Sequence, residues 1–394
     1  MDKMETSVPP DDPNDAHDMV SPRKPHRHSK DGILGCDELT RYFPSGKVNI
    51  MLITWNMSGN EPPKELDDLL LPESMKYVPD VYAIALQEAV HSELKELETR
   101  MQTTIGPSHV LLHSVIHGVL CLAVFVRRDI IWFFSIPEDD VYNCRHASIN
   151  MIKTKGAVAI SFQFFGTSFL FICSHLPAHE DRNKERKEQY EKIITELDLP
   201  RNLRPLKPRY VSNDVTARFD VVFWFGDLNF RVERTYDETL AILDGISVSS
   251  NPSSFDPLLK MDQLTRGLED RSLFVGFNEV RPVCFPPTFK HTIDSQEYDR
   301  ECQRVPSYTD RILVRTKRPG HVTCSAYDSI RGIQTSDHRP VMALVECQIR
   351  PGKDTIPLNA GLFKRDIYVE GLRRRAEENF GDGHRKENEG CGVS

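Results

Sequence analysis

Runs of apolar residues about as long as a β-strand recur along most of the chain, and several end in polar side chains. Residues 48–57, 80–88 and 221–229 each contain an apolar run and finish near an Asn, Glu or Asp. Short apolar runs bounded by Gly and polar residues are typical of buried strands. Further strands are predicted at residues 109–114, 118–127, 130–135, 156–164, 168–174, 310–314 and 341–345.

Charged segments with apolar residues at helical spacing separate the predicted strands. We expect helices at residues 91–101, 180–197, 237–243, 257–268 and 366–379. Two sheets packed face to face with helices outside would bury this many apolar runs, and polar strand ends would gather along one rim. We therefore predict an α+β fold, a four-layer α/β/β/α sandwich of two mixed β-sheets flanked by helices.

Composition divides the chain of 394 residues into three parts. Residues 1–45 are rich in Pro, Asp, His and Ser, which predicts a disordered tail. Residues 46–350 hold the predicted strands and form the folded domain, and residues 351–394 are predicted to be a second tail that carries one helix. No stretch approaches the roughly 20 apolar residues of a spanning helix, so we expect any membrane contact to be peripheral.

Charge and cysteine content narrow the classes of function. The net charge of −8 argues against nucleic acid as a partner bound through a basic surface, whereas an acidic site that binds a divalent metal fits this balance. The nine cysteines are scattered singly, which favours a reducing compartment over a disulfide framework or a zinc site.

Polar residues at the predicted strand ends form a set suited to phosphoester hydrolysis. They are Asn56, Glu88, His175, Asp227, Asn229, Asp310, Asp337 and His338. Carboxylates bind hard cations and activate water, amides orient it, and imidazoles stabilise the charge that builds on phosphate. Single members have structural explanations, since Gly-Asp-x-Asn is also an ordinary turn and a lone His is more often structural than catalytic. The whole set is hard to explain as packing.

Two longer motifs connect the chain to a known family. Residues 224–231 (Trp-Phe-Gly-Asp-Leu-Asn-Phe-Arg) and 306–313 (Pro-Ser-Tyr-Thr-Asp-Arg-Ile-Leu) resemble the signature motifs of inositol polyphosphate 5-phosphatases, in the endonuclease/exonuclease/phosphatase superfamily. Four shorter motifs stand in the family order, so the resemblance extends from about residue 51 to residue 345. Residues 153–157 and 164–169 are similar to the type IV members of that family.

This resemblance implies a DNase I-like fold and a Mg²⁺-dependent phosphoric monoester hydrolase. Its implied substrates are the membrane phosphoinositides PI(4,5)P2, PI(3,4,5)P3 and PI(3,5)P2, from which it removes the 5-phosphate. Glu88 and Asn56 would hold Mg²⁺, with Asp337 supporting the metal or its water shell. Asp227 would orient or deprotonate the attacking water, and Asn229 would place it in line.

The family resemblance also assigns the histidines. His338, oriented by Asp310, would donate to the phosphate, and His175 would be a second donor. Direct attack by a histidine is the mechanistic alternative.

Substrate contacts are expected around the second motif. Lys290, Tyr298 and Arg304 match the residues that bind the neighbouring 4-phosphate in the family, whereas one family lysine is replaced by Cys302 or lost to a deletion. Arg231 and Arg311 are further candidates for substrate binding. The Asp-Arg sequence that contains Arg311 is equally typical of a buried structural ion pair.

The C-terminal residues Cys391-Gly392-Val393-Ser394 form a C-a-a-X box whose terminal Ser favours a farnesyl group on Cys391. A single lipid chain binds membranes weakly, so residues 373–375, all Arg, are either a second membrane signal or part of a mixed-charge helix. The type IV resemblance implies a peripheral, lipid-anchored protein on the cytoplasmic face of the primary cilium and Golgi. Ciliary trafficking proteins that bind the prenylated tail are then expected as partners.

Two alternatives use the same residues. A nuclease or sphingomyelinase of the superfamily would share the metal and histidine set, but Lys290 and Arg304 favour the inositide. A catalytically silent phosphoinositide-binding adaptor would lack one of Glu88, Asp227 and His338, all of which are present.

Overall fold

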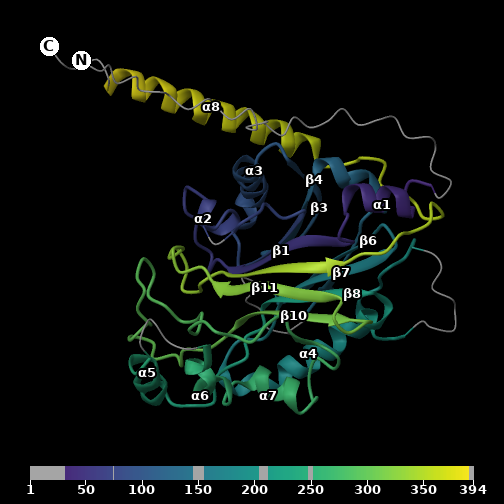
Figure 1. Cartoon of the computed structure of the whole chain (residues 1–394). Helices are drawn as coiled ribbons and strands as arrows, with labels where there is room; N and C mark the ends of the chain where they lie inside the picture. Colours follow the sequence, from purple (N-terminus) through teal and green to yellow (C-terminus); the bar gives the residue numbers. More distant parts are fainter. Residues whose placement is uncertain (1–31, 74, 145–154, 204–211, 247–251, 390–394) are drawn as a thin grey trace, which may run out of the picture.

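The computed structural model describes residues 32–73, 75–144, 155–203, 212–246 and 252–389. Within them two six-stranded sheets have the orders β11-β12-β1-β2-β4-β3 and β5-β6-β7-β8-β10-β9 (Figure 1). The first sheet contains β1 (Lys47–Asn56), β2 (Val81–Gln87), β3 (His109–His117), β4 (Leu120–Arg127), β11 (Val322–Ser329) and β12 (Val341–Gln348). The second contains β5 (Glu138–Asn143), β6 (Gly156–Phe164), β7 (Thr167–His175), β8 (Val221–Asp227), β9 (Asn278–Glu279) and β10 (Asp310–Thr316). One pair in each sheet is parallel, β1 with β2 and β7 with β8, so both sheets are mixed.

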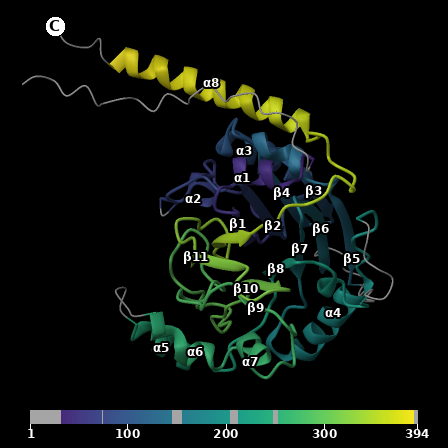
Figure 2. The same cartoon turned by 45° about the vertical axis from the view of Figure 1, so that its right-hand side comes forward.

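Helices lie outside the two sheets, as Figures 1 and 2 show. On the side of the first sheet are α2 (Asp67–Leu70), α3 (Leu94–Ile105) and α8 (Arg365–Glu389). On the side of the second are α4 (Asn183–Glu196), α5 (Tyr236–Asp244), α6 (Asp256–Leu259) and α7 (Gln263–Glu269). Short 3-10 helices are η1 (His91–Glu93), η2 (Arg128–Phe133), η3 (Glu180–Arg182), η5 (Val215–Arg218) and η6 (Pro252–Phe255). No described helix is both long and apolar enough to cross a membrane.

Alternating side chains of the strands build three apolar layers. In β8, Phe223 and Phe225 enter the core between the sheets, while Trp224 turns outward and packs on Tyr190 of α4. In β1, Leu52 faces the core between the sheets and Ile53 faces the layer beneath α3. Because successive side chains of a strand point to opposite faces, a strand covered on both faces is apolar throughout. The predicted four-layer sandwich is confirmed.

Several predicted elements differ from the structure, two of them in kind or in number. The strand predicted at residues 130–135 is wrong, because residues 128–133 form η2, in which Ile130 and Ile131 are both buried. A short apolar run has the same composition in a buried strand and in a buried helical turn. The single helix predicted at 257–268 is two helices, because α6 ends at Leu259 and Asp262 caps the start of α7 by accepting from Thr265 N.

The folded domain begins before residue 46. Residues 1–31 lie outside the described residues, but residues 36–42 of the predicted tail form α1 (Cys36–Tyr42). Leu34, Leu39 and Phe43 are buried in the core between the sheets. Asp354, in the predicted C-terminal tail, accepts from the backbone N–H groups of Ile33 and Leu34 at 2.7 and 2.9 Å. Both predicted tails therefore contain folded segments.

The predicted C-terminal helix is longer than expected, because α8 runs to Glu389. Arg373 pairs with Glu370 and Glu377. Arg374 pairs with Glu96 of α3, and Arg375 donates to the last carbonyls of α3, at 2.8 and 2.9 Å. These contacts favour the mixed-charge helix over a second membrane signal. Cys391 lies outside the described residues, so its farnesyl group stays a prediction.

Candidate active site

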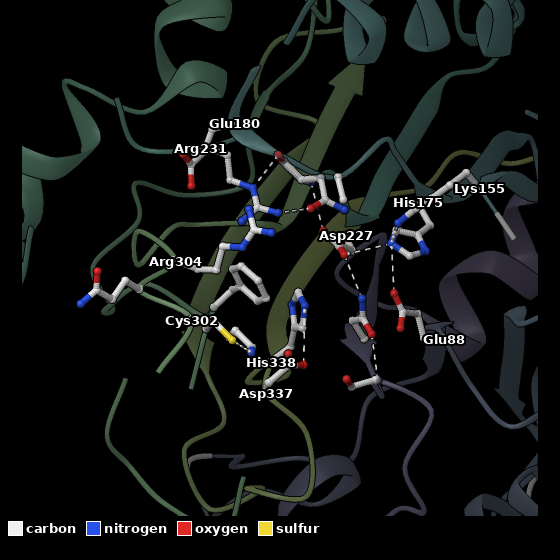
Figure 3. Close-up of a pocket in the computed structure, with 17 residues that line it drawn as sticks. Glu88, Lys155, His175, Glu180, Asp227, Arg231, Cys302, Arg304, Asp337 and His338 are labelled. Atoms are coloured by element: carbon white, nitrogen blue, oxygen red, sulfur yellow. Dashed lines mark hydrogen bonds and ion pairs between the residues drawn. The ribbon is translucent and has the colours of Figure 1, made fainter. Parts of the chain in front are cut away.

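The polar strand ends meet at one rim of the sandwich. His175 at the end of β7 and Asp310 at the start of β10 both pair in register with Asp227 at the end of β8. Asn56, at the end of β1 in the other sheet, donates from Nδ2 to Asp227 Oδ2 at 2.8 Å. His175, Asp227 and Asn56 line one side of a pocket of about 500 Å³ (Figure 3), and Asp310 lies behind it, against His338. The pocket is also lined by Glu88, Lys155, Asn229, Arg231, Phe289, Lys290, Cys302, Arg304, Asp337 and His338.

The backbone around the pocket is locally strained. Glu88, Asn229 and His179 have φ values of 50°, 57° and 80°, a region that costs a side-chain-bearing residue on the order of 1–3 kcal/mol. Gly226 has a φ of 149°, and a Cβ there would lie 2.0 Å from Ser174 O, so no other residue fits before Asp227. Strain of this kind persists where a fixed side-chain direction is needed.

Asp227 is the electrostatic centre of the pocket. Its Oδ2 lies 3.2 Å from Nε2 of His175, and the Asn229 N–H donates to its Oδ1 at 3.1 Å. Burial raises the pKa of Asp227, but the hydrogen bond from His175 and the charges of His175, His338 and Lys155 outweigh it and lower the pKa. The carboxylate is therefore ionised at neutral pH.

His175 lies between acidic and basic groups. Its Nε2 is 3.8 Å from Glu88 Oε1 and also contacts Nζ of Lys155. Burial and the Lys155 charge lower the pKa of His175. Lys155 was not predicted to be a site residue, although it directly precedes Gly156, which pairs with His175 across the β6–β7 hairpin. The hairpin register is the signal that would have identified it.

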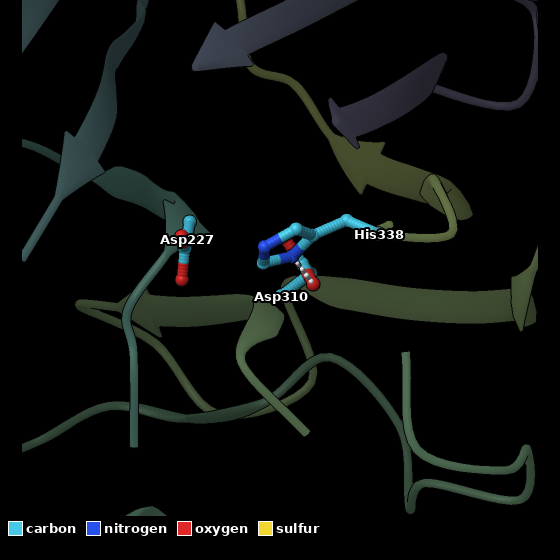
Figure 4. Close-up of side chains that lie close together, drawn as sticks. All are labelled: Asp227, Asp310 and His338. Atoms are coloured by element: carbon cyan, nitrogen blue, oxygen red, sulfur yellow. Dashed lines mark hydrogen bonds and ion pairs between the residues drawn. The ribbon is translucent and has the colours of Figure 1, made fainter. Parts of the chain in front are cut away.

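His338 and Asp310 form a buried pair (Figure 4). Nδ1 of His338 lies 2.8 Å from Oδ2 of Asp310, and Nε2 lies 4.0 Å from Oδ1 of Asp337. Burial lowers the pKa of His338, but Asp310, with Asp227 and Asp337, raises it to about 9. His338 is consequently a cation with a proton available on Nε2.

The donor set of the pocket fits a hard divalent cation. Glu88, Asn56 and Asp337 all line it, and they offer the carboxylate and amide oxygens that such ions prefer. Oδ1 of Asp337 is buried and has no hydrogen-bond partner among the described residues. Asp227, Asp310 and His338 also have ligand atoms within 4.8 Å of one another. In that second group, however, Oδ2 of Asp310 is already committed to His338.

The predicted substrate residues separate into two groups. Lys290, Arg231 and Arg304 line the pocket. Lys290 donates to Asp299 at 2.7 Å, and Arg304 lies 3.3 Å from Nδ1 of His179. Arg231 donates to Asn229 Oδ1 at 2.5 Å and stacks over Phe289, so it also supports the Asp227 turn.

Tyr298 and Arg311 do not line this pocket. Tyr298 donates to Pro287 O at 2.8 Å and faces a neighbouring cavity. Arg311 is fully buried between Asp262, at 2.7 Å, and Glu279, whose Oε1 accepts from Nε at 2.7 Å. The structural ion pair, not substrate binding, is therefore the interpretation of Arg311 that agrees with the structure.

Comparisons with known proteins agree with this geometry. Residues 53–344 match the family described as Endonuclease/Exonuclease/phosphatase family 2. The chain is 46% identical over 348 residues to phosphatidylinositol polyphosphate 5-phosphatase type IV of Homo sapiens, covering 87% of this chain and 52% of that protein. It is 30% identical over 321 residues to phosphatidylinositol 3,4,5-trisphosphate 5-phosphatase 1 of Homo sapiens, covering 77% and 26%. The chain thus spans about half the length of the type IV relatives it matches.

A solved structure shares the fold. It is the inositol polyphosphate 5-phosphatase domain of SPSynaptojanin, in complex with inositol (1,4)-bisphosphate and a calcium ion. Its TM-score is 0.66 at 26% identity, and the match covers 88% of this chain and 97% of that chain.

Proposed function

The chain belongs to the Endonuclease/Exonuclease/phosphatase family 2, and from that premise we propose that it is a Mg²⁺-dependent phosphoinositide 5-phosphatase. One observation carries the proposal. The ionised Asp227 and the protonated His338 share a pocket with two further cations, Lys290 and Arg304, and so a second phosphate can bind beside the reacting one. The relatives named as phosphoinositide 5-phosphatases support the same substrate class.

A divalent cation held by Glu88 and Asn56, with Asp337 nearby, would neutralise charge on the scissile phosphate. Asp227 orients the attacking water and accepts its proton as the new P–O bond forms. The P–O bond to the inositol 5-oxygen breaks in the same step, and that oxygen takes up a proton from solvent water. His338 donates from Nε2 to the phosphate as negative charge builds, because Asp310 holds its Nδ1. Asn229 acts indirectly, since its side chain is held by Arg231 and by Leu176 O.

The test is phosphate release from vesicles that contain PI(4,5)P2, PI(3,4,5)P3 or PI(3,5)P2, with Mg²⁺ and with a chelator. We expect release that the chelator abolishes and that Asp227→Asn lowers by about 10²- to 10⁴-fold. Asp129→Asn, an exposed carboxylate outside the pocket, is the matched control. Duplex DNA and sphingomyelin vesicles complete the panel. Hydrolysis of these and not of the phosphoinositides, or full activity of Asp227→Asn, would contradict the proposal.

Membrane attachment through a farnesyl group on Cys391, and location at the primary cilium and Golgi, stay predictions from the sequence. A Cys391→Ser variant of a fluorescent fusion should lose its membrane location if they are right. The intact mass of the C-terminal peptide tests the lipid directly.

A further inference from the structure

Asp310 is bound through one oxygen only. Its Oδ2 accepts from Thr288 Oγ1 at 2.7 Å and from Thr309 Oγ1 at 2.9 Å, in addition to His338 Nδ1 at 2.8 Å. Its Oδ1 is buried and has no hydrogen-bond partner among the described residues. The exposed fractions of Asp310, Thr288 and Thr309 are all 0%. Thr288, Thr309 and His338 therefore all donate to the same oxygen of Asp310.

A carboxylate with one unsatisfied buried oxygen gains free energy by turning that oxygen toward a donor. The torsion that would turn it is soft, because a terminal Asp torsion is broad and nearly two-fold. Each threonine hydroxyl has a single proton to donate, and both protons go to Oδ2. The two hydroxyls thus oppose the rotation that would take Oδ2 away from the imidazole.

The same threonines also hold the neighbouring backbone. Thr288 O accepts from the N–H of Arg339, the residue after His338, at 2.9 Å. Thr309 O accepts from the N–H of Leu228, the residue after Asp227, at 2.8 Å. Each threonine therefore connects Asp310, through its side chain, to the segment that carries another reacting group, through its main chain. A β-branched side chain with few rotamers suits this task.

We infer that Thr288 and Thr309 are positioning residues for the reaction: their hydroxyls keep Oδ2 of Asp310 on Nδ1 of His338 and so keep Nε2 directed into the pocket. Neither hydroxyl touches substrate in this scheme, because both donate to Asp310, and Thr309 Oγ1 also lies 3.4 Å from Nδ1 of His338. The predicted effect on kcat rests on the proposed function, whereas the hydrogen-bond geometry does not.

The kinetic test replaces each hydroxyl by a methyl group of similar size. Thr288→Val and Thr309→Val are expected to lower kcat for PI(4,5)P2 by about 10- to 100-fold, the effect of losing one hydrogen bond to a charged group, with KM within about twofold. Thr288→Ser and Thr309→Ser keep the donor and should stay within about threefold of the wild type. Thr103→Val, a buried threonine of α3 that donates to Thr99 O, is the matched control and should leave kcat unchanged.

A double-mutant cycle asks whether the effect passes through Asp310. In an Asp310→Asn background, adding Thr288→Val should change kcat by less than about twofold, because the two residues act as one unit. An equal loss in both backgrounds, or equal behaviour of the Ser and Val variants, would overturn the inference. If Asp310→Asn has no measurable activity, the Ser and Val pairs decide alone.

A measurement without turnover separates this inference from the proposed function. The proton between Nδ1 of His338 and Asp310 should give a downfield NMR resonance, assigned by its loss in His338→Gln. We expect Thr288→Ser to keep the resonance and Thr288→Val to lose or shift it. An unchanged resonance in Thr288→Val would refute the positioning role even if the lipids are hydrolysed. If the wild type hydrolyses none of the lipids, the proposed function is refuted. The NMR spectrum would then still test whether the threonines hold Asp310.

Discussion

Substituting Arg311 tests whether this residue stabilises the core or binds substrate in the pocket. Its guanidinium is fully buried, with Nη1 2.7 Å from Asp262 and Nε 2.7 Å from Glu279. Glu279 is held on its other oxygen by the Tyr327 hydroxyl at 2.9 Å. Replacing Arg311 with Met keeps most of the apolar volume but leaves two carboxylates without their cation. We expect this change to destabilise the fold and to leave substrate affinity intact.

The magnitude follows from the burial of the pair. Removing one partner of a buried ion pair costs about 3–5 kcal/mol, because the remaining charge loses its compensation. Burial already raises the pKa of Glu279, although Arg311 opposes the shift, so the variant can relieve part of the cost by protonating Glu279. We therefore expect the lower half of that range near neutral pH. At about 2 °C per kcal/mol for a chain of this size, Tm should fall by about 6–8 °C.

The assay is thermal unfolding followed by circular dichroism, paired with KM for PI(4,5)P2 well below Tm. Arg315→Met is the matched control, since Arg315 lies four residues further along β10 and pairs with Asp214 at 2.6 Å, but both side chains are 26% exposed. A half-buried pair that water still reaches contributes about 0–1 kcal/mol, so Tm of the control should fall by less than about 2 °C. An Arg311→Met variant with unchanged Tm and a raised KM would restore the substrate-binding role and refute the reasoning from burial.

Three further predictions concern pH, chain length and substrate. Burial lowers the pKa of His109 to about 4, so the native state resists a proton that the unfolded chain binds near pH 6.5. Between pH 6.5 and 5 the free energy of unfolding should fall by about 1.6 kcal/mol more in the wild type than in His109→Gln, and equal shifts of the urea midpoint in the two proteins would contradict this. A chain beginning at residue 46 should be about 5 kcal/mol less stable than one beginning at residue 32, which keeps three buried apolar side chains, and matching Tm values would exclude it. Lys290→Met should raise KM for PI(4,5)P2 by about tenfold and leave PI(3,5)P2 unaffected; an equal change on both lipids argues against a 4-phosphate contact.

The apolar runs alone predicted the sandwich, because strands that are buried on both faces are apolar throughout. A run such as residues 221–225 has no polar position that another fold could place in water. The same argument failed at residues 130–135, because apolar side chains can be buried by a 3-10 helix as well as by an extended strand. It also missed β11, whose residues alternate between partly buried and exposed and carry little apolar signal. Sequence patterns therefore located elements covered on two sides better than elements at a sheet edge.

The polar strand ends were predicted as a set, and the structure brings Asn56, Asp227 and His338 to one pocket. Lys155, Thr288 and Thr309 were not predicted to be site residues. Lysine and threonine are common on exposed surfaces, and what distinguishes these three is the partner that the fold places beside each of them. A contact between a side chain and a residue distant in sequence requires the register of two strands or loops. No local pattern contains that register.

The second motif shows the same limit within two adjacent residues. Asp310 and Arg311 stand side by side at the start of β10, yet Asp310 holds His338 at the pocket and Arg311 holds Asp262 at the N-cap of α7. Successive side chains of a strand point to opposite faces of the sheet, so two residues that are adjacent in sequence lie in different surroundings. The second motif thus contains one residue that positions a reacting group and one residue that stabilises the core. A substitution at Asp310 should consequently lower kcat as well as Tm, because Asp310 also belongs to a buried ion pair, whereas one at Arg311 should lower Tm and leave kcat unchanged.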